Sequence, residues 1–363
     1  MNVCDETAKR LKLKEPLGFE ETAKLCFEIG HPKLKKWGNT IGRATTTFVC
    51  ITQSGFCCVY IVFISTNIKQ VWDFYMPQAP ISIVMAVILI PMILLSWIKD
   101  LKSLAPISTL ANILVSASVI IVIVVAVLDL PDISERRLVS NFSSLPLFFG
   151  TVVYTFEGVG LVTPIKIKSK KPEKFGNILG PLNVAMTILA FLIITLGFIG
   201  YWRWGDAVEG SLTLNLDQDS ILAQVMKVLI SLGVLFTYPL QLSPVITNFM
   251  EFLNKKFVSC KHPLVLNLAF RTFYTLFLFT LAEAVPHLAV FVSLVGAVSS
   301  TAIALIIPPI MDSATFYEDY GKFYWKIWKN VLIMIFGLIG FATGTYYSLV
   351  DVINTFGHSE GVR

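Results

Sequence analysis

VVYTFEGVGLVTPIKIKSKKPEKF (residues 152–175) begins as an apolar segment and ends as a run of lysines. Glu157 stands between the two parts, and Gly158 and Gly160 follow it within three residues. A charged side chain at the centre of a membrane costs at least ~2.5 kcal/mol. A glycine lowers helix stability by about 1 kcal/mol relative to alanine. The stretch therefore places a charge and a helix breaker at the same depth of one apolar segment.

The composition of the whole chain extends this pattern. Of its 363 residues, 55% are hydrophobic and only 15% are charged, and the mean hydropathy is +0.71. A soluble domain has roughly 25% charged residues. This deficit predicts an all-α polytopic membrane protein. The lysines behind the net charge of +5 lie between apolar segments, so the charge indicates membrane orientation and not nucleic-acid binding.

Nine segments are long and apolar enough to be membrane helices, which need about 20 such residues. They lie at roughly 43–67, 79–98, 104–128, 144–164, 180–202, 220–248, 264–284, 287–309 and 330–352. We expect the sixth to be interrupted by YPLQLSP (238–244), which holds two prolines. The predicted organisation is a cytoplasmic basic tail or loop at 1–42, a transmembrane domain at 43–353 and a non-cytoplasmic tail at 354–363.

Lysine and arginine residues gather on one side of these spans. The chain up to Arg43 carries nine of them, and five lysines follow Pro164 before Phe175. The positive-inside rule then places the N-terminus in the cytoplasm and the C-terminus outside the cell or in a lumen. Asn141, in the sequon Asn-Phe-Ser, falls on the non-cytoplasmic side, as N-glycosylation requires.

Glu157 is the main candidate for a functional residue. An ionisable side chain within the membrane marks a path for substrate, ions or protons. Unwound backbone is tolerated at that depth only when it is buried in protein or lines a cavity, and transporters use such discontinuous helices to bind substrates and coupling ions. The alternative is that the glycines allow a close helix–helix contact and that Glu157 is a structural hydrogen-bonding residue.

Three further polar clusters lie within apolar segments and could line the same cavity. They are Thr52–Ser54, Tyr238–Pro244 and Ser299–Thr301. Hydroxyl groups of this kind often bond back to their own helix, which is the structural alternative for each cluster. Lys227 and Arg271 lie a turn or two inside their spans, and we expect both to snorkel to the membrane interface.

Motifs of soluble enzymes are absent from the sequence. It has no GxSxG, HExxH or GxxxxGK[ST] motif. The six cysteines do not form two metal-type CxxC pairs, and the four histidines are far apart in the chain. We therefore expect no enzyme activity, no disulfide, no metal site and no cofactor.

FEGVGLVTP (156–164) followed by KKPEKFG (170–176) resembles the sixth transmembrane helix and the next loop of the amino acid/auxin permease family. The similarity is greatest to its proton-coupled amino acid transporters, in particular the insect pathetic-like group, and covers about residues 21–353. Further matching motifs are ITQSGFCCVYIVFISTNIKQV (51–71), YWRWGDAVEGSLTLNLD (201–217), FTYPLQLSP (236–244), VSLVGAVSSTAIALIIPP (292–309) and WKNVLIMIFGLIGFATGTYYSLVDVI (328–353).

The resemblance implies the 5+5 inverted-repeat transporter fold with one added C-terminal helix. It also implies transport of small neutral amino acids with protons across a plasma or lysosomal membrane. On this pattern the segment around Glu157 is the second of two broken helices at the substrate site, and Glu157 is the candidate for proton coupling. The expected substrate-binding residues are Thr155, Phe156, Glu157, Gly158, Gly160, Gln53, Tyr238 and Gln241.

The sequence departs from the family in two places. Its first predicted span matches the family's third helix, so the first two helices, including the other broken helix, are missing. We interpret this as a truncated isoform or an incomplete gene model. Pro164-Ile165-Lys166-Ile167 stands where the family reads Pro-Leu-Glu-Asn. The alternatives to transport are therefore a non-transporting amino-acid sensor or binding partner at a lysosomal membrane, or a non-functional truncated isoform.

Overall fold

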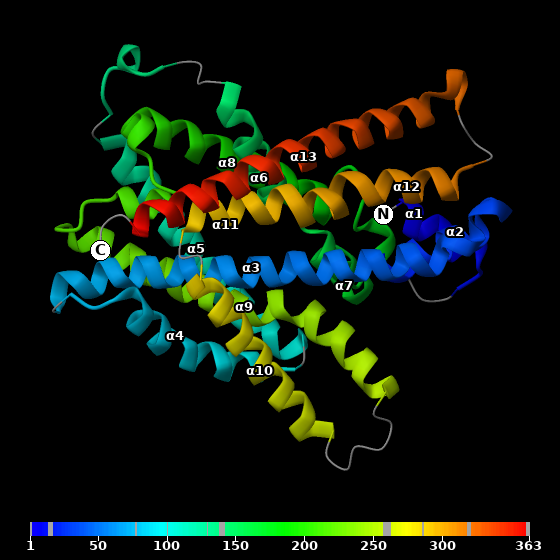
Figure 1. Ribbon diagram of the computed structural model, residues 1–363, viewed down its shortest axis with the longest axis horizontal. Coiled ribbons are helices and arrows are strands. Elements are labelled where there is room, and N and C mark those ends of the chain that lie inside the picture. Colours follow the sequence, from blue (N-terminus) through cyan, green and yellow to red (C-terminus); the bar gives the residue numbers. More distant parts are fainter. Residues whose placement is uncertain are drawn as a thin grey trace. The chain divides into compact units, whose positions relative to one another are not determined.

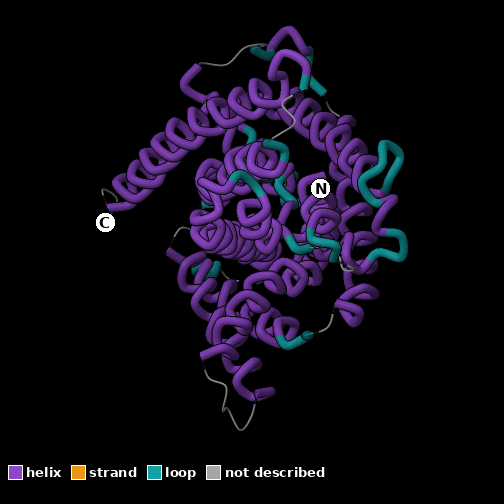
Figure 2. The backbone as a smooth tube through the Cα atoms, turned by 90° about the vertical axis from the view of Figure 1, so that its right-hand side faces the viewer, coloured by secondary structure: helices purple, strands orange, loops and turns teal. Residues whose placement is uncertain are grey.

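The computed structural model describes residues 2–13, 17–76, 78–99, 101–128, 130–137, 142–256, 263–284, 287–317 and 321–360. Within these ranges the chain forms helices joined by short loops, and no β-strand occurs (Figure 2). The all-α prediction is thus confirmed. The chain divides into two compact units. Unit 1 comprises Met1–Thr52, Phe142–Leu189 and Val292–Arg363, and unit 2 comprises Gln53–Asn141 and Ala190–Phe291.

Eight helical segments of the described chain are long and apolar enough to cross a membrane, which confirms the polytopic architecture. The one predicted span that is not among these eight is 79–98. It corresponds to α4 (Ile81–Ser96), an apolar helix of 16 residues. At 1.5 Å per residue this helix is ~24 Å long, shorter than the hydrocarbon core of about 30 Å. The eight segments are Pro32–Tyr75, Leu104–Leu128, Leu145–Lys168, Pro181–Ala207, Ile221–Glu251, Leu264–Ala284, Leu288–Thr315 and Trp325–Ile353.

Unit 1 contains the broken helix and the elements packed around it (Figure 1). Three helices, α3 (Gly38–Tyr75), α8 (Pro181–Trp204) and α11 (Leu288–Val295), contribute residues to both units. The helices wholly in unit 1 are α1 (Asn2–Arg10), α2 (Phe19–Ile29), α6 (Leu145–Phe156), α7 (Val159–Lys168), α12 (Ile307–Thr315) and α13 (Trp325–Glu360). Its short elements are the 3-10 turns Pro32–Trp37, Phe142–Ser144, Pro172–Lys174 and Lys322–Tyr324 and the π-helical segments η7 (Gly296–Ser300) and η8 (Ala302–Ile306).

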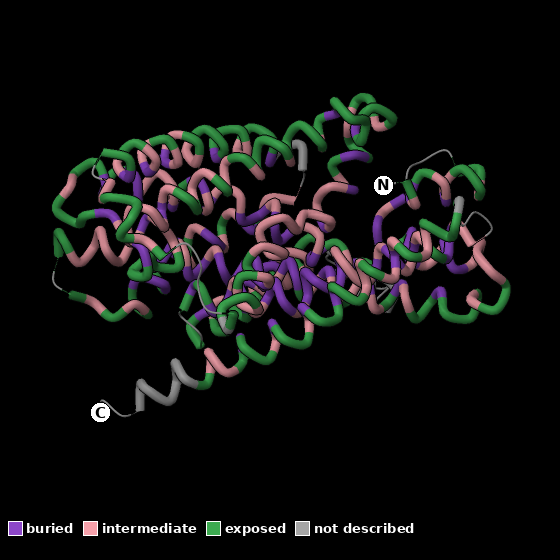
Figure 3. Tube along the Cα trace, turned by 90° about the horizontal axis from the view of Figure 1, so that it is seen from above, coloured by how far each residue is buried: buried purple, intermediate pink, exposed green. Residues whose placement is uncertain are grey.

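Small residues bring the helices of unit 1 close together. A Cβ atom added to Gly296 would lie 1.8 Å from the Gly150 carbonyl oxygen, so α6 and η7 touch backbone to backbone. On α13, the buried residues Gly337, Gly340, Gly344 and Ser348 recur every three or four positions, which places them on one helix face. Gly344 faces Ala297. The rest of α13 carries exposed large apolar residues (Figure 3), as a surface facing lipid would.

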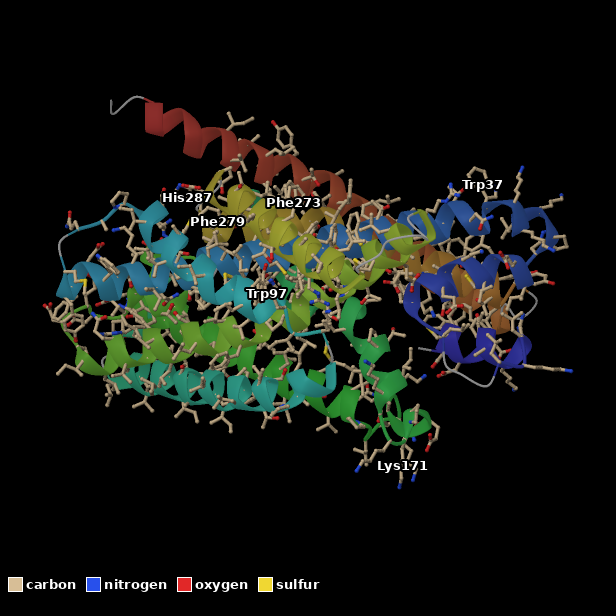
Figure 4. All side chains as sticks on the ribbon, turned by 90° about the horizontal axis from the view of Figure 1, so that it is seen from below. Trp37, Trp97, Lys171, Phe273, Phe279 and His287 are labelled. Carbon is tan, nitrogen blue, oxygen red and sulfur yellow. The ribbon has the colours of Figure 1, made fainter. Side chains whose placement is uncertain are left out.

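Residues at the N-terminal end form more than a tail. The helices α1 and α2 pack on each other and on α12. Their apolar residues join a core of Phe19, Ala23, Cys26, Phe27, Val49, Ile303, Ile307, Met311 and Ala314. Burial raises the pKa of the Cys26 thiol to about 12, so this thiol stays protonated at neutral pH and is a poor nucleophile. Trp37, in the basic turn before α3, is exposed and points away from the helices (Figure 4).

Unit 2 is built on the pairing of α5 (Leu101–Leu128) with α9 (Ile221–Lys256), and α4 packs against α9 and α10 (Pro263–Ala284). Its short elements are the 3-10 turns Ile133–Glu135, Gly205–Ala207 and Leu212–Asn215. The helix α9 runs without a break through Pro239 and Pro244, so the predicted interruption at 238–244 is wrong. Each proline removes one backbone donor but keeps a helical φ, so the helix can continue through both.

The expectation that Lys227 and Arg271 snorkel to the interface is also wrong. The Arg271 side chain is 5% exposed and donates hydrogen bonds to the carbonyl oxygens of Ser96 (2.7 Å) and Ile98 (3.2 Å). It thereby satisfies carbonyl groups at the end of α4 that have no partner within that helix. Lys227 is 0% exposed, and its Nζ lies 3.5 Å from the Leu216 carbonyl oxygen. Both cations bind backbone oxygens inside unit 2.

Candidate functional site

The predicted helix break is present and lies at Glu157 and Gly158. The helix α6 ends at Phe156, Glu157 is extended with φ −73° and ψ 132°, and α7 begins at Val159. The Glu157 Oε1 atom accepts a hydrogen bond of 2.8 Å from the Val159 amide. A carboxylate at a helix N-terminus replaces a missing carbonyl acceptor and interacts favourably with the helix dipole. The residue that ends α6 therefore also caps α7.

The second carboxylate oxygen of Glu157 takes no part in this cap. Oε2 is buried and has no hydrogen-bond partner among the described residues. A buried polar atom without a partner costs about 1–3 kcal/mol, so few such atoms persist in a protein and each one needs an explanation. Here the free oxygen lies in the gap of a broken helix, where a proton or a ligand donor would satisfy it.

Gly158 is not required for helix packing. A Cβ atom placed on it would make an ordinary contact of 3.7 Å with Val162 Cγ2. Gly150 instead makes the close approaches of α6. A Cβ atom added to Gly150 would lie 2.5 Å from the Ser293 carbonyl oxygen. The packing role that the sequence left open for Gly158 is therefore not observed. Gly150 serves the helix–helix contact, and Gly158 lies at the break.

The π-helical segment η7 contacts α6, and η8 follows it in the chain. The Ser299 and Thr301 hydroxyls donate to the carbonyl oxygens of Val295 (3.1 Å) and Gly296 (2.8 Å), as the structural alternative for this cluster predicts. Ser300 behaves differently, because its buried hydroxyl has no partner among the described residues. Widened turns of this kind are frequent at functional sites.

The contact between α6 and η7 and the packing of α7 are made at separate points. Gly296 approaches the Tyr154 side chain, 2.9 Å from the position of an added Cβ. Val159 packs against the core cluster to which Ile303 and Ile307 belong. The sequence pointed to the cluster 299–301 but could not single out Ser300.

The remaining predicted residues fall into two groups. In unit 1, Thr155, Phe156 and Gly160 flank the break, and the Thr155 hydroxyl is already engaged, donating to the Thr151 carbonyl oxygen at 2.7 Å. In unit 2, Gln53 lies on α3, and Tyr238 and Gln241 lie on α9. Asn141, the expected glycosylation site, lies outside the described residues.

Within unit 2, α10 connects the helices that carry Gln53 and Tyr238. The Tyr274 hydroxyl forms a 2.7 Å hydrogen bond with Ser54, and the Tyr238 hydroxyl donates to Thr275 Oγ1 at 3.3 Å. Gln53 is 1% exposed, and neither atom of its amide group has a partner among the described residues. Its buried amide is thus a second unsatisfied polar group at a predicted binding position.

Two ionic contacts of unit 1 were not anticipated. Lys166 is buried and forms an ion pair with Asp5 of α1, 161 positions away in the chain. Asp312, at the end of α12, accepts a 2.8 Å hydrogen bond from Asn330 and lies 3.5 Å from Lys329. The only sequence signal for the first was the lysine in place of the family's acidic residue, and that signal names no partner.

Comparison with known proteins gives the family. The model of the family described as transmembrane amino acid transporter protein matches residues 6–350. The proton-coupled amino acid transporter-like protein pathetic of Drosophila melanogaster is 32% identical over 348 residues, which cover 95% of this chain and 73% of the relative. The amino acid transporter AVT3C of Arabidopsis thaliana is 27% identical over 358 residues, covering 90% of this chain and 78% of the relative. These relatives are transporters and not enzymes, and the chain belongs to the transmembrane amino acid transporter protein family.

Proposed function

We propose that this membrane protein carries small neutral amino acids together with protons, and that Glu157 is the residue that holds the proton. The family assigns transmembrane amino acid transport. The observation that supports the finer proposal is the buried, unpartnered Oε2 atom of Glu157 at the break between α6 and α7. The name of the Drosophila relative, which includes proton coupling, agrees with it.

The two oxygens of Glu157 have different tasks in this mechanism. Oε1 stays bound to the Val159 amide and keeps α7 capped. Oε2 takes up the proton. Protonation neutralises the carboxylate, which lies in the low-dielectric part of the membrane, where an ionised side chain is unfavourable. A protonated Oε2 is also a donor, and the carboxylate of a zwitterionic amino acid is a suitable acceptor. One proton then accompanies one neutral substrate, and a single positive charge moves in each cycle.

Uptake into proteoliposomes tests this proposal. Radiolabelled alanine or proline should accumulate in wild-type vesicles when the outside is made acidic, and an ionophore that collapses the proton gradient should abolish the accumulation. Glu157→Gln keeps an oxygen that can accept from Val159 but cannot titrate. We expect this variant to lose gradient-driven accumulation while still exchanging labelled for unlabelled substrate.

Thr151→Val is a matched control on the same helix, because the exposed Thr151 hydroxyl only donates to the Leu147 carbonyl oxygen. It should accumulate substrate as the wild type does. Absence of uptake and exchange by well-folded wild-type protein would contradict the transport of small neutral amino acids. Gradient-driven accumulation that persists in Glu157→Gln would contradict the role given to Glu157.

We further propose that the end of α7 faces the cytoplasm. The lysines that follow the break support this orientation by the positive-inside rule, and Lys171 points outward from the loop after α7 (Figure 4). A cysteine placed at Lys171 should react with a membrane-impermeant maleimide only after cells are permeabilised. Labelling of intact cells would reverse the orientation. A fluorescent fusion imaged with a lysosomal marker distinguishes the plasma membrane from the lysosome.

A further inference from the structure

We propose that Asp5 and Lys166 form a latch that holds α7 in place and closes the site at the end of unit 1 where α1 lies. The inference builds on the proposed transport function, because it concerns how the same broken helix opens. Its elements are the buried lysine of α7, the short N-terminal helix that supplies its partner and the hinge at Gly158.

The burial of the positively charged Lys166 side chain is unusual. Its residue is 5% exposed, although it lies in the last turn of a helix that ends among exposed lysines. Its Nζ binds the Asp5 Oδ1 atom, whereas the Asp5 side chain remains 57% exposed. Removing one partner of a buried ion pair leaves an uncompensated charge. Lys166 therefore depends on α1, and Asp5 can be withdrawn into water.

A small, partly open apolar pocket adjoins α1. Val3, Cys4, Phe19, Pro308 and Met311 surround an apolar cavity of about 60 Å³ between α1, α2 and α12. Residues that line a cavity lack contact atoms on one side and lose that part of their packing energy. The hydroxyl of Thr7, also on α1, is buried without a partner among the described residues. The helix α1 has nine residues and packs mainly on α2 and α12, and the ion pair of Asp5 with Lys166 links it to α7.

The position of Lys166 makes the pair a latch. The helix α7 starts directly after Gly158, and Lys166 lies about two turns further along. Among the described residues, Gly158 bonds only within α7, its carbonyl oxygen accepting from the Leu161 (3.0 Å) and Val162 (2.9 Å) amides. In this proposal the backbone before α7 is therefore the hinge about which the helix rotates as a rigid rod, as hinge motions of half-helices require. With Asp5 bound, the far end of that rod is tied to α1. When the pair opens, α7 is free to swing, and the gap beside Glu157 becomes accessible from the end where α1 lies.

Thiol labelling measures this opening without any need for transport. Thr163, a buried residue one turn before Lys166, is replaced by cysteine in a cysteine-free full-length chain. A membrane-impermeant maleimide is then applied from the side on which α1 lies. We expect slow labelling with Asp5 present and at least about ten-fold faster labelling in Asp5→Asn, because the latch is open.

Glu6→Gln is the matched control, because Glu6 pairs with Arg10 on α1 (2.9 Å) and not with α7. It should leave the labelling rate unchanged. The double variant Asp5→Lys with Lys166→Asp should restore slow labelling, which a general destabilisation of α1 would not allow. Equal rates in Asp5→Asn and in the parent protein would overturn the latch.

A reversible cross-link supplies the second test. In the same background, cysteines at positions 5 and 166 are joined by copper–phenanthroline oxidation and released by a thiol reductant. We expect the joined protein to stop substrate uptake and the reduced protein to regain it. Uptake that continues at the full rate in the joined protein would contradict the latch. A protein that shows the labelling difference but never transports would contradict the proposed function alone.

Discussion

The segment around Glu157 and the segment around Pro239 both set helix-breaking residues beside polar side chains, yet only the first is broken. In unit 1, α6 stops at Phe156 and α7 begins at Val159. In unit 2, α9 continues through two prolines for 36 residues. The difference lies in where the polar side chain is directed. Glu157 accepts from the Val159 amide, whereas the Tyr238 hydroxyl donates to Thr275 on another helix.

This comparison shows that a helix breaker is not sufficient for a break inside a membrane. Unwinding exposes backbone amides, and without water each needs another acceptor. Glu157 supplies one, so the backbone can leave the helix at little cost. The segment 238–244 contains no aspartate or glutamate, and there the helical backbone provides the acceptors. The carboxylate, more than the glycine, therefore decides where the chain opens.

The largest effect should come from removing that acceptor. Glu157→Ala deletes both the cap of α7 and the proposed proton site, whereas Glu157→Gln keeps an acceptor for Val159. Loss of a hydrogen bond to a charged group is equivalent to about 1.5–3 kcal/mol, so we expect substrate uptake to fall about 100-fold in the alanine variant. Initial uptake rates in proteoliposomes, normalised to folded protein, measure it. An alanine variant as active as the glutamine variant would show that the cap plays no part.

The next effect concerns the contact that supports the break. A methyl group at Gly296 would lie 1.8 Å from the Gly150 carbonyl oxygen, and neither backbone can move aside freely. We expect Gly296→Ala to lower the free energy of unfolding by about 1–3 kcal/mol, as overpacking generally does. A fall in the thermal unfolding midpoint in detergent measures this loss. An unchanged midpoint would mean that α6 and η7 are not in backbone contact.

The same substitution at Gly158 should behave in the opposite way. Its added methyl group has room, so the protein should fold as well as the wild type. Alanine favours a continuous helix over glycine by about 1 kcal/mol, which corresponds to an approximately five-fold loss of uptake. Thermal unfolding and uptake are measured on the same preparation. Full activity in Gly158→Ala would show that flexibility at the break is not needed for transport.

Much of this arrangement follows from the sequence, and the rest fails for identifiable reasons. The apolar segments and the break at Glu157 were predictable because they depend on local composition and on residues adjacent in the chain. The continuity of α9 was not, because a proline removes a backbone donor but does not by itself force the helix to end. Arg271 and Lys227 were misplaced for a different reason. Their backbone acceptors lie outside the helices that carry them, Ser96 far away in the chain from Arg271 and Leu216 in the loop before α9, and periodicity carries no information about such contacts.

The smallest effect is expected at Pro239, and it is the sharpest check on the comparison. Since α9 is already continuous there, Pro239→Ala only restores one backbone donor, which can bond to the carbonyl group one turn earlier. The hydroxyl of Tyr238 keeps its acceptor on Thr275. A mid-helix bond of this kind adds about 1 kcal/mol or less of net stability, so uptake should change less than about two-fold. A Pro239→Ala variant that folds normally but loses most of its uptake would mean that α9 must also unwind during transport. The transport cycle would then need a helix break in each unit. The Glu157 carboxylate would explain only the break between α6 and α7, which is the one present in this structure.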